Sequence, residues 1–146
     1  MITAADIELL RGLTKKAPSL ARLAGGKNSF ALLYSRWFVL ELPATMFDPA
    51  LTDWEEAHDA AAAWRNVIPP GEGEYAQATR WTNPEDNVPL IKLIAGSASA
   101  LIHTSIYEVV MKKLPEPEFR VFVGDKPYVA ILSAGSLVGG AGQVKV

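Results

Sequence analysis

The sequence predicts a single α+β domain, in which two short helices are combined with antiparallel sheets. Two segments carry apolar residues at helical spacing behind a helix-start signal, one near the N-terminus and one near residue 105. Most of the remaining chain consists of short stretches rich in β-branched and aromatic residues, separated by turn residues. The chain has 146 residues, of which 49% are hydrophobic and 21% charged, as is typical of one globular domain.

The first helix is predicted between Ala4 and Lys16, where apolar side chains recur every three or four positions. Thr3 precedes this segment and Asp6 follows three residues later, which is the spacing of a capping box. Pro18 limits the helix, because the residue before a proline is pushed out of the helical region.

The middle of the first half is less regular. Two strands are predicted from Ser29 to Leu42, interrupted at Ser35-Arg36. The alanine-rich segment from Asp53 to Val67 predicts a short helix. The polar stretch from Asn83 to Asn87 predicts a turn.

The second helix is predicted from Ser105 to Lys113. Glu108 stands three residues after Ser105, which again fits a capping box, and Pro115 supplies the stop. The other strand-like stretches run from Tyr75 to Trp81, Val88 to Ala95, Phe119 to Val123, Tyr128 to Leu132 and Leu137 to Val146. The last three are separated by turns predicted at Gly124-Asp125-Lys126-Pro127 and Ser133-Ala134-Gly135-Ser136.

Two halves of the chain, 1–70 and 71–146, follow a similar plan. Each contains a helix, a Lys-Lys-x-Pro ending and antiparallel strands, and the endings are Lys15-Lys16-Ala17-Pro18 and Lys112-Lys113-Leu114-Pro115. This similarity indicates a duplication inside one domain. A chance match in so short a window is the alternative.

We expect no catalytic residues, no cofactor and no bound metal. The strongest candidate set is Glu55, His58 and Asp59, because residues three apart on a helix share a face and could ligate one metal ion. A solvated polar face of an alanine-rich helix explains the same residues, and no second Glu-x-x-His pair exists in the sequence.

His103 stands beside Thr104 and Ser105, a combination that could activate a hydroxyl nucleophile. No Gly-x-Ser-x-Gly elbow accompanies it, so a loop or helix-cap position is the preferred interpretation. The glycines between residues 135 and 142 indicate a bent edge strand, since no Lys-Ser or Lys-Thr of a phosphate loop follows them.

Composition also bears on the compartment. The sequence has no cysteine, which fits a reducing environment, and it shows neither a signal peptide nor an apolar run of about 18 residues. We therefore expect a cytoplasmic protein. Its net charge of −2 gives no general attraction to nucleic acid, so DNA contact would require a local cluster of cations.

Five cations could form such a cluster. Arg11, Lys15 and Lys16 belong to the first predicted helix, and Lys112 and Lys113 belong to the second. If both helices pack on one side of a sheet, these residues would face one phosphate backbone. The alternative is that lysines at the ends of helices only complement the helix dipoles.

Two segments resemble the DNA sliding-clamp family of bacteria and phages, the polymerase processivity factors of the β-subunit type. Trp64-Arg65-Asn66-Val67-Ile68-Pro69 is similar to a Trp/Tyr-Arg-x-Val-Ile-Pro segment between clamp domains. The closing stretch from Phe119 to Val146, with its Lys126-Pro127 turn, resembles the end of a clamp. The last residues, Gln143-Val144-Lys145-Val146, differ from the Met-Pro-x-Arg-like strand of the family, so no residues of the family's partner-peptide pocket are carried over.

The resemblance implies a DNA-clamp-like domain of two helix-plus-antiparallel-sheet halves, with the helices facing DNA and a role in DNA replication and processivity. Clamp rings contain six such domains, so one domain would act as a homo-oligomer or without closing a ring. The expected partners are double-stranded DNA, bound nonspecifically, and replication proteins, and a phage or prophage origin is compatible with the resemblance.

Two other functions remain open. The chain could be a protein-interaction or assembly module that uses exposed strand edges and aromatic residues such as Trp37 and Trp81. It could also be a small metal-dependent enzyme that uses Glu55, His58 and Asp59.

Overall fold

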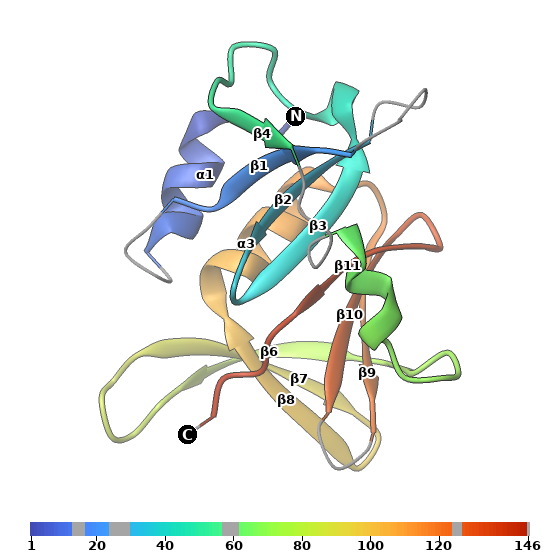
Figure 1. The fold of residues 1–146 in the computed structure, drawn as a ribbon. Coiled ribbons are helices and arrows are strands. Elements are labelled where there is room, and N and C mark those ends of the chain that lie inside the picture. Colours follow the sequence, from blue (N-terminus) through green and yellow to red (C-terminus); the bar gives the residue numbers. More distant parts are fainter. Residues whose placement is uncertain (13–16, 24–29, 57–61, 124–126, 146) are drawn as a thin grey trace. The chain divides into compact units, whose positions relative to one another are not determined.

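The computed structural model describes residues 1–12, 17–23, 30–56, 62–123 and 127–145 (Figure 1). The chain divides into two compact units, Met1–Val67 and Ile68–Val146. The described residues form helices α1 and α3 and a larger proportion of strands, which confirms the α+β class. Within these residues no helix is long and apolar enough to cross a membrane.

The first unit contains helix α1 and four neighbouring strands of a sheet, in the order β4-β1-β2-β3. Strands β1, β2 and β3 pair antiparallel in sequence, whereas β4 pairs parallel with β1. The elements are α1 (Ala4–Arg11), β1 (Ser19–Arg22), β2 (Phe30–Ser35), β3 (Phe38–Pro43), a 3₁₀ turn (Ala44–Met46), β4 (Trp54–Glu56) and a second 3₁₀ turn (Trp64–Val67).

The capping box at the start of α1 is confirmed. The Asp6 amide donates to the Thr3 hydroxyl over 3.4 Å, and the Thr3 amide donates to the Asp6 carboxylate over 2.8 Å. These bonds satisfy two of the helix-start donors and also pair the buried Asp6. The helix ends at Arg11 with Gly12 as its C-cap, short of the predicted end at Lys16. Residues 13–16 lie outside the described residues.

The predicted helix from Asp53 to Val67 is wrong at its start. Trp54–Glu56 forms strand β4, and Asp53 before it has a φ of 65°, in the left-handed region that interrupts a helix. The pairing of β4 with β1 gives Trp54–Glu56 backbone hydrogen bonds across the sheet in place of those of a helix. Residues 57–61 lie outside the described part of the chain.

The last turn of the first unit is attached to strand β3 through Glu41. The Trp64 indole donates to one carboxylate oxygen over 3.3 Å, and the Arg65 guanidinium donates to the other over 2.8 Å. The Arg65 guanidinium also lies 4.5 Å from the centre of the Trp64 ring. These contacts hold the indole against the sheet, where Trp64 is 6% exposed.

The second unit contains one helix and two antiparallel groups of strands. One group has the order β6-β7-β8, and the other has the order β11-β10-β9-β5. The elements are β5 (Glu74–Tyr75), β6 (Gln77–Thr82), β7 (Pro89–Ala95), β8 (Ala98–His103), α3 (Thr104–Lys113), β9 (Pro117–Phe122), β10 (Tyr128–Ser133) and β11 (Ser136–Ala141).

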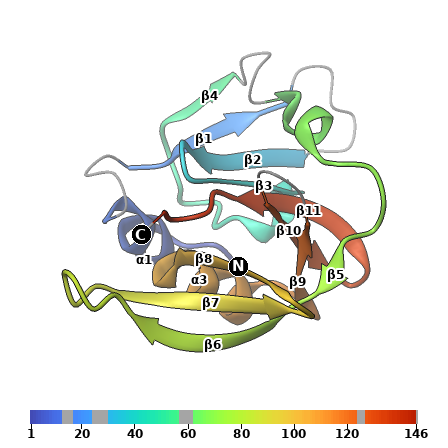
Figure 2. The ribbon, with the colours of Figure 1, turned by 90° about the horizontal axis from the view of Figure 1, so that it is seen from below.

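Helix α3 lies against the β6-β7-β8 sheet (Figure 2). It contacts β7 and β8 through its apolar side, on which Ile106, Val109 and Val110 are buried. Buried positions alternate along β8 and along β7 from Ile91 to Ala95, since one sheet face meets the helix, and Leu90 on the other face of β7 is also buried. Part of the core of this unit therefore lies between α3 and strands β7 and β8.

The capping box predicted at Ser105 and Glu108 is wrong. The helix begins one residue earlier, at Thr104, and its N-cap is His103, which makes no side-chain capping hydrogen bond. The Thr104 hydroxyl instead donates to the Pro89 carbonyl over 2.8 Å. Strand β8 runs directly into the helix, so the position of the first turn is set by the pairing of β8 with β7.

The turns of the second unit were predicted well. Asn83 accepts a hydrogen bond from the Glu85 amide, and Asn87 adopts a φ of 60°, so the predicted turn is confirmed. Ala134 and Gly135 both have positive φ, as a two-residue hairpin turn of type I′ requires. The last strand ends at Ala141 and not at Val146.

Each unit places one helix before three consecutive antiparallel strands. In the first unit α1 precedes β1, β2 and β3, and in the second unit α3 precedes β9, β10 and β11.

Candidate functional site

The five predicted DNA-contacting cations have different surroundings. Arg11, in the last turn of α1, is exposed and forms an ion pair with Glu8 over 3.5 Å. Lys112 and Lys113 share the last turn of α3, where Lys112 is exposed and Lys113 is partly buried. Lys15 and Lys16 lie outside the described residues.

Lys112 and Lys113 are the two members of this set that the structure brings together. Arg11 belongs to the first unit and the lysines belong to the second, so a common cationic surface stays a prediction. Glu108 stands one helical turn before Lys112 and is also exposed, which partly offsets the positive charge. Both lysines also lie where the helix dipole favours cations.

Of the candidate metal ligands, Glu55 does not lie on the predicted helix. Glu55 lies on β4 and accepts a hydrogen bond of 2.9 Å from the Tyr34 hydroxyl, while His58 and Asp59 lie outside the described residues. Partial burial, together with the neighbouring Glu55, raises the pKa of Tyr34. Among the residues that the structure describes, no group of three or more His, Cys, Asp or Glu could hold a metal ion.

His103 occupies the junction between β8 and α3, which agrees with the predicted helix-cap position. Burial lowers the pKa of His103, because a charged imidazolium loses hydration there. On the same sheet face, His103 lies opposite Leu90, and Leu90 lies opposite Trp81. The adjacent Thr104 hydroxyl donates to a backbone carbonyl, so it is not aimed at the imidazole as a nucleophile would be.

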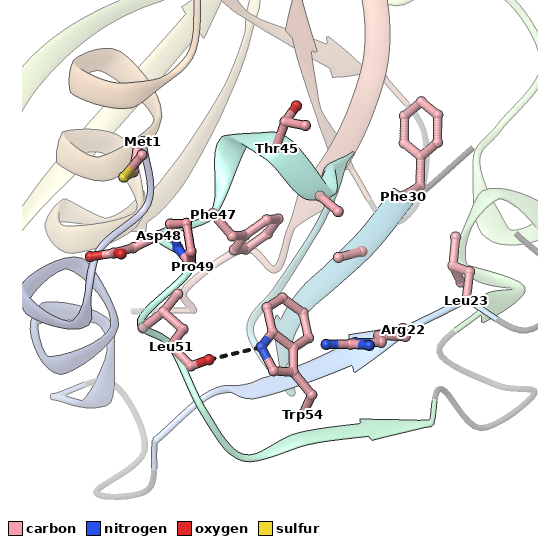
Figure 3. A pocket seen from close by; sticks show the side chains of 12 residues that line it. Met1, Arg22, Leu23, Phe30, Thr45, Phe47, Asp48, Pro49, Leu51 and Trp54 are labelled. Carbon is pink, nitrogen blue, oxygen red and sulfur yellow. Dashed lines mark hydrogen bonds between the residues drawn. The ribbon is translucent and has the colours of Figure 1, made fainter. Parts of the chain in front are cut away.

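A pocket of about 670 Å³ lies in the first unit (Figure 3). Its wall combines an aromatic pair with a cation: the Phe47 and Trp54 rings meet edge to face with centroids 5.5 Å apart. The Arg22 guanidinium lies 5.4 Å from the centre of the Trp54 ring. The Trp54 indole is held by a hydrogen bond of 3.1 Å to the Leu51 carbonyl, drawn as the dashed line in Figure 3.

This pocket is chemically suited to apolar groups. Apart from Arg22, Thr45 and Asp48, its described lining is apolar, and that lining contains no histidine. The pocket therefore offers mainly apolar contact area beside the aromatic pair, with Arg22, Thr45 and Asp48 as its polar groups.

Sequence reasoning did not find this pocket. Trp54 stood in a predicted helix, and nothing local connects it with Arg22, which lies more than thirty positions earlier. The two meet because β4 pairs in parallel with β1, in the register that aligns Leu20 with Trp54 and Arg22 with Glu56. An aromatic residue beside a turn-rich segment was the one available signal.

The two tryptophans considered for protein interaction are both partly exposed. Trp37 lies in the β2-β3 turn, where the Arg36 guanidinium lies 5.4 Å from its ring centre. Trp81 lies on β6, a strand with no buried residue. No protein-family model, curated protein or solved structure matches the chain.

Proposed function

We propose that this chain is a non-enzymatic binding domain with a DNA-clamp-like plan, which associates nonspecifically with double-stranded DNA and acts as a homo-oligomer with replication proteins in the cytoplasm. The proposal rests on one observation above all. In each unit a single helix precedes three consecutive antiparallel strands.

The repeated plan supports the proposal because a clamp-type domain is built from two similar helix-plus-sheet halves. The same order of elements in both units is what a duplication produces. The similar Lys-Lys-x-Pro segments that begin at Lys15 and Lys112 give a second, sequence-based reason to relate the units.

The proposed DNA contact depends on the positive charge of lysines at the end of α3. Lys112 is exposed at the end of α3, and lysines placed this way can neutralise phosphates without reading bases. The overall charge of −2 keeps such an interaction local and weak. Salt competes with the lysines for the phosphates, so this weak binding should fall further as the salt concentration rises.

The test is a titration of a short duplex with the protein at about 50 mM and about 200 mM salt. We expect binding at the lower salt, equal for unrelated sequences. Lys112→Gln with Lys113→Gln should weaken it, and the slope of log affinity against log salt should fall by about 1 for each phosphate that the variant leaves unneutralised. Adding Lys15→Gln and Lys16→Gln should weaken it further.

The matched control is Lys92→Gln with Lys145→Gln, which changes the net charge equally at positions outside the helices. This control should bind like the original protein. An absence of binding at low salt would refute the DNA proposal, and equal weakening in the two double variants would refute the assignment to the end of α3.

A second candidate function is a protein-interaction or assembly module without nucleic-acid binding. The exposure of β6 along its whole length favours it, because unpaired strand edges recruit further strands. Light scattering separates the two functions: assembly through a strand edge persists at high salt, whereas DNA association does not. A monomer under all conditions would count against this candidate.

A further inference from the structure

Strand β6 is an outer strand of the β6-β7-β8 sheet (Figure 2). Its residues are exposed apart from the partly exposed Trp81. It pairs with β7 without a register shift from Gln77 to Thr82, and no described strand pairs with its other side. The opposite edge is partly covered, because the Val144 amide donates to the Leu101 carbonyl on β8 over 2.8 Å.

The usual protections of an edge strand are missing from β6. Its six residues include no proline, lysine or bulge, and Arg80 is its one charged residue. Natural proteins usually carry such features on an edge strand that must not pair with a further strand. The unprotected edge indicates that β6 has a strand partner.

The direction of the backbone hydrogen bonds shows which amides and carbonyls of β6 point away from β7 and can pair with another strand. The Asn83 amide donates to the Val88 carbonyl over 3.0 Å, so this pair faces β7. Residues in an antiparallel ladder alternate in direction, and therefore the amides and carbonyls of Ala78, Arg80 and Thr82 point away from β7.

We propose that β6 pairs antiparallel with β6 of a second copy, about a two-fold axis at Thr79. Ala78 then lies opposite Arg80 of the second copy, and the reverse pair is generated by the axis. Each of these two pairs has outward-pointing groups in both copies and exchanges two hydrogen bonds. This inference deepens the self-association proposed above and does not involve the lysines of α3.

Side chains favour this register over the neighbouring one. With the axis at Thr79, two threonines face each other and Trp81 lies opposite Gln77 of the second copy, on the sheet face away from α3. With the axis at Arg80, two like charges would face each other, which is destabilising. A two-fold axis perpendicular to the sheet places the same sheet face of both copies on the same side. A register halfway between these two would put residues of opposite faces opposite each other, so it is excluded.

Charges beyond the ends of β6 give this dimer a distinctive salt response. Glu72 and Glu74 precede the strand, Glu85 and Asp86 follow it, and all four are exposed. Antiparallel pairing brings the leading acids of one copy toward the trailing acids of the other. Salt screens this repulsion within about 10 Å at 0.1 M, so the dimer fraction should rise with salt.

The decisive experiment uses the absence of cysteine in the sequence. In Thr79→Cys the two thiols of a dimer would lie at a non-hydrogen-bonded pair, where Cβ atoms are about 4.5–5.5 Å apart, and mild oxidation should give a disulfide-linked dimer. Ser99→Cys is the matched control, since Ser99 is exposed on the same sheet face but on β8. Equal cross-linking of both variants would overturn the proposal.

A second pair of variants measures self-association without cross-linking. Sedimentation at protein concentrations up to about 0.1 mM should show a dimer for the original chain and for Ser99→Lys, and a monomer for Thr79→Lys. Circular dichroism must show that both variants are folded, as expected for exposed positions. A dimer that persists in Thr79→Lys, or an original chain that stays monomeric at about 0.5 M salt, would overturn the proposal. Titration of the same variants with DNA separates this result from the DNA proposal, because a change at Thr79 should alter dimer formation and leave the affinity for DNA unchanged.

Discussion

At the scale of single residues, the two helices begin in different ways. Thr3 and Asp6 close a complete capping box at the start of α1. His103 occupies the same position before α3 without such a bond, and its imidazole is half-buried in the sheet. The start of α3 therefore depends on the strand before it, and the buried imidazole makes that junction sensitive to pH.

The pH prediction follows from the lowered pKa of His103. The unfolded chain binds a proton near the ordinary pKa of about 6.5, whereas the folded chain binds it at a lower pH. The stability contributed by neutral His103 is thus present above about 6.5 and is lost as the pH falls from there toward the folded pKa. Thermal melts at about pH 7.5 and about pH 5 should show this loss.

His103→Gln is the control for this prediction, because a glutamine does not titrate. Its melting temperature should fall less between the two pH values than that of the original protein. A fall of the same size in both proteins would show that other groups carry the pH dependence.

At the scale of elements, the β10-β11 hairpin shows why a strand contains consecutive glycines. Gly140 lies beneath the Tyr128 ring, and a Cβ at position 140 would overlap the tyrosine hydroxyl and lie 2.8 Å from the adjacent ring carbon. The ring packs on the glycine backbone, where it also meets Phe122 at a centroid distance of 6.3 Å. The glycine is required by this close approach and not by a turn.

Gly140→Ala should therefore destabilise the protein by about 1–3 kcal/mol, the usual range for overpacking. Gly12→Ala is the matched control, since it has the same effect on the unfolded chain but adds a Cβ in ordinary contact, 3.6 Å from the Leu9 carbonyl oxygen. Urea unfolding of both variants measures the difference. Equal free energies of unfolding for the two variants would contradict the packing argument.

Strand β4 shows the limit of local patterns at this scale. Its three residues sit beside an alanine-rich stretch, and the composition favoured a helix there. The parallel pairing with β1 gives the segment a different backbone, and it also builds the pocket around Trp54. Helix propensity spans well under 1 kcal/mol per residue for ordinary residues, so a few ladder hydrogen bonds can override it.

At the scale of the whole molecule, the two proposed interactions respond to salt in opposite directions. DNA association depends on attraction between lysines and phosphates, which salt weakens. Pairing through β6 brings like-charged acids together, and salt relieves their repulsion. The distribution of charges along the chain, rather than its net value of −2, decides both responses.

We therefore expect that between about 50 mM and about 500 mM salt the affinity for a duplex falls while the fraction of dimer rises. Fluorescence anisotropy of the duplex and sedimentation of the protein alone measure the two quantities. Thr79→Lys should lose the rise of the dimer fraction with salt and keep the fall of the affinity for the duplex. A parallel decline of both would indicate one electrostatic surface for both interactions.

The sequence by itself determined those features whose causes lie within a few residues. The capping box at Thr3, the turn after Asn83 and the positive-φ hairpin turn at Gly135 are all local, because the side chain and the backbone groups that it satisfies are close in the chain. The α+β class followed from the alternation of such segments.

Only the tertiary structure decided which strands pair and which edge stays open. Strand β8 was missed because its small and polar residues, such as Ala98 and Ser99, give a weak alternating pattern, and its burial comes from α3. The pocket at Trp54 and the open edge of β6 likewise depend on pairing partners that are remote in sequence. The hydrophobic periodicity of the sequence indicates which positions are buried. The element that covers them is determined by the packing of the whole chain.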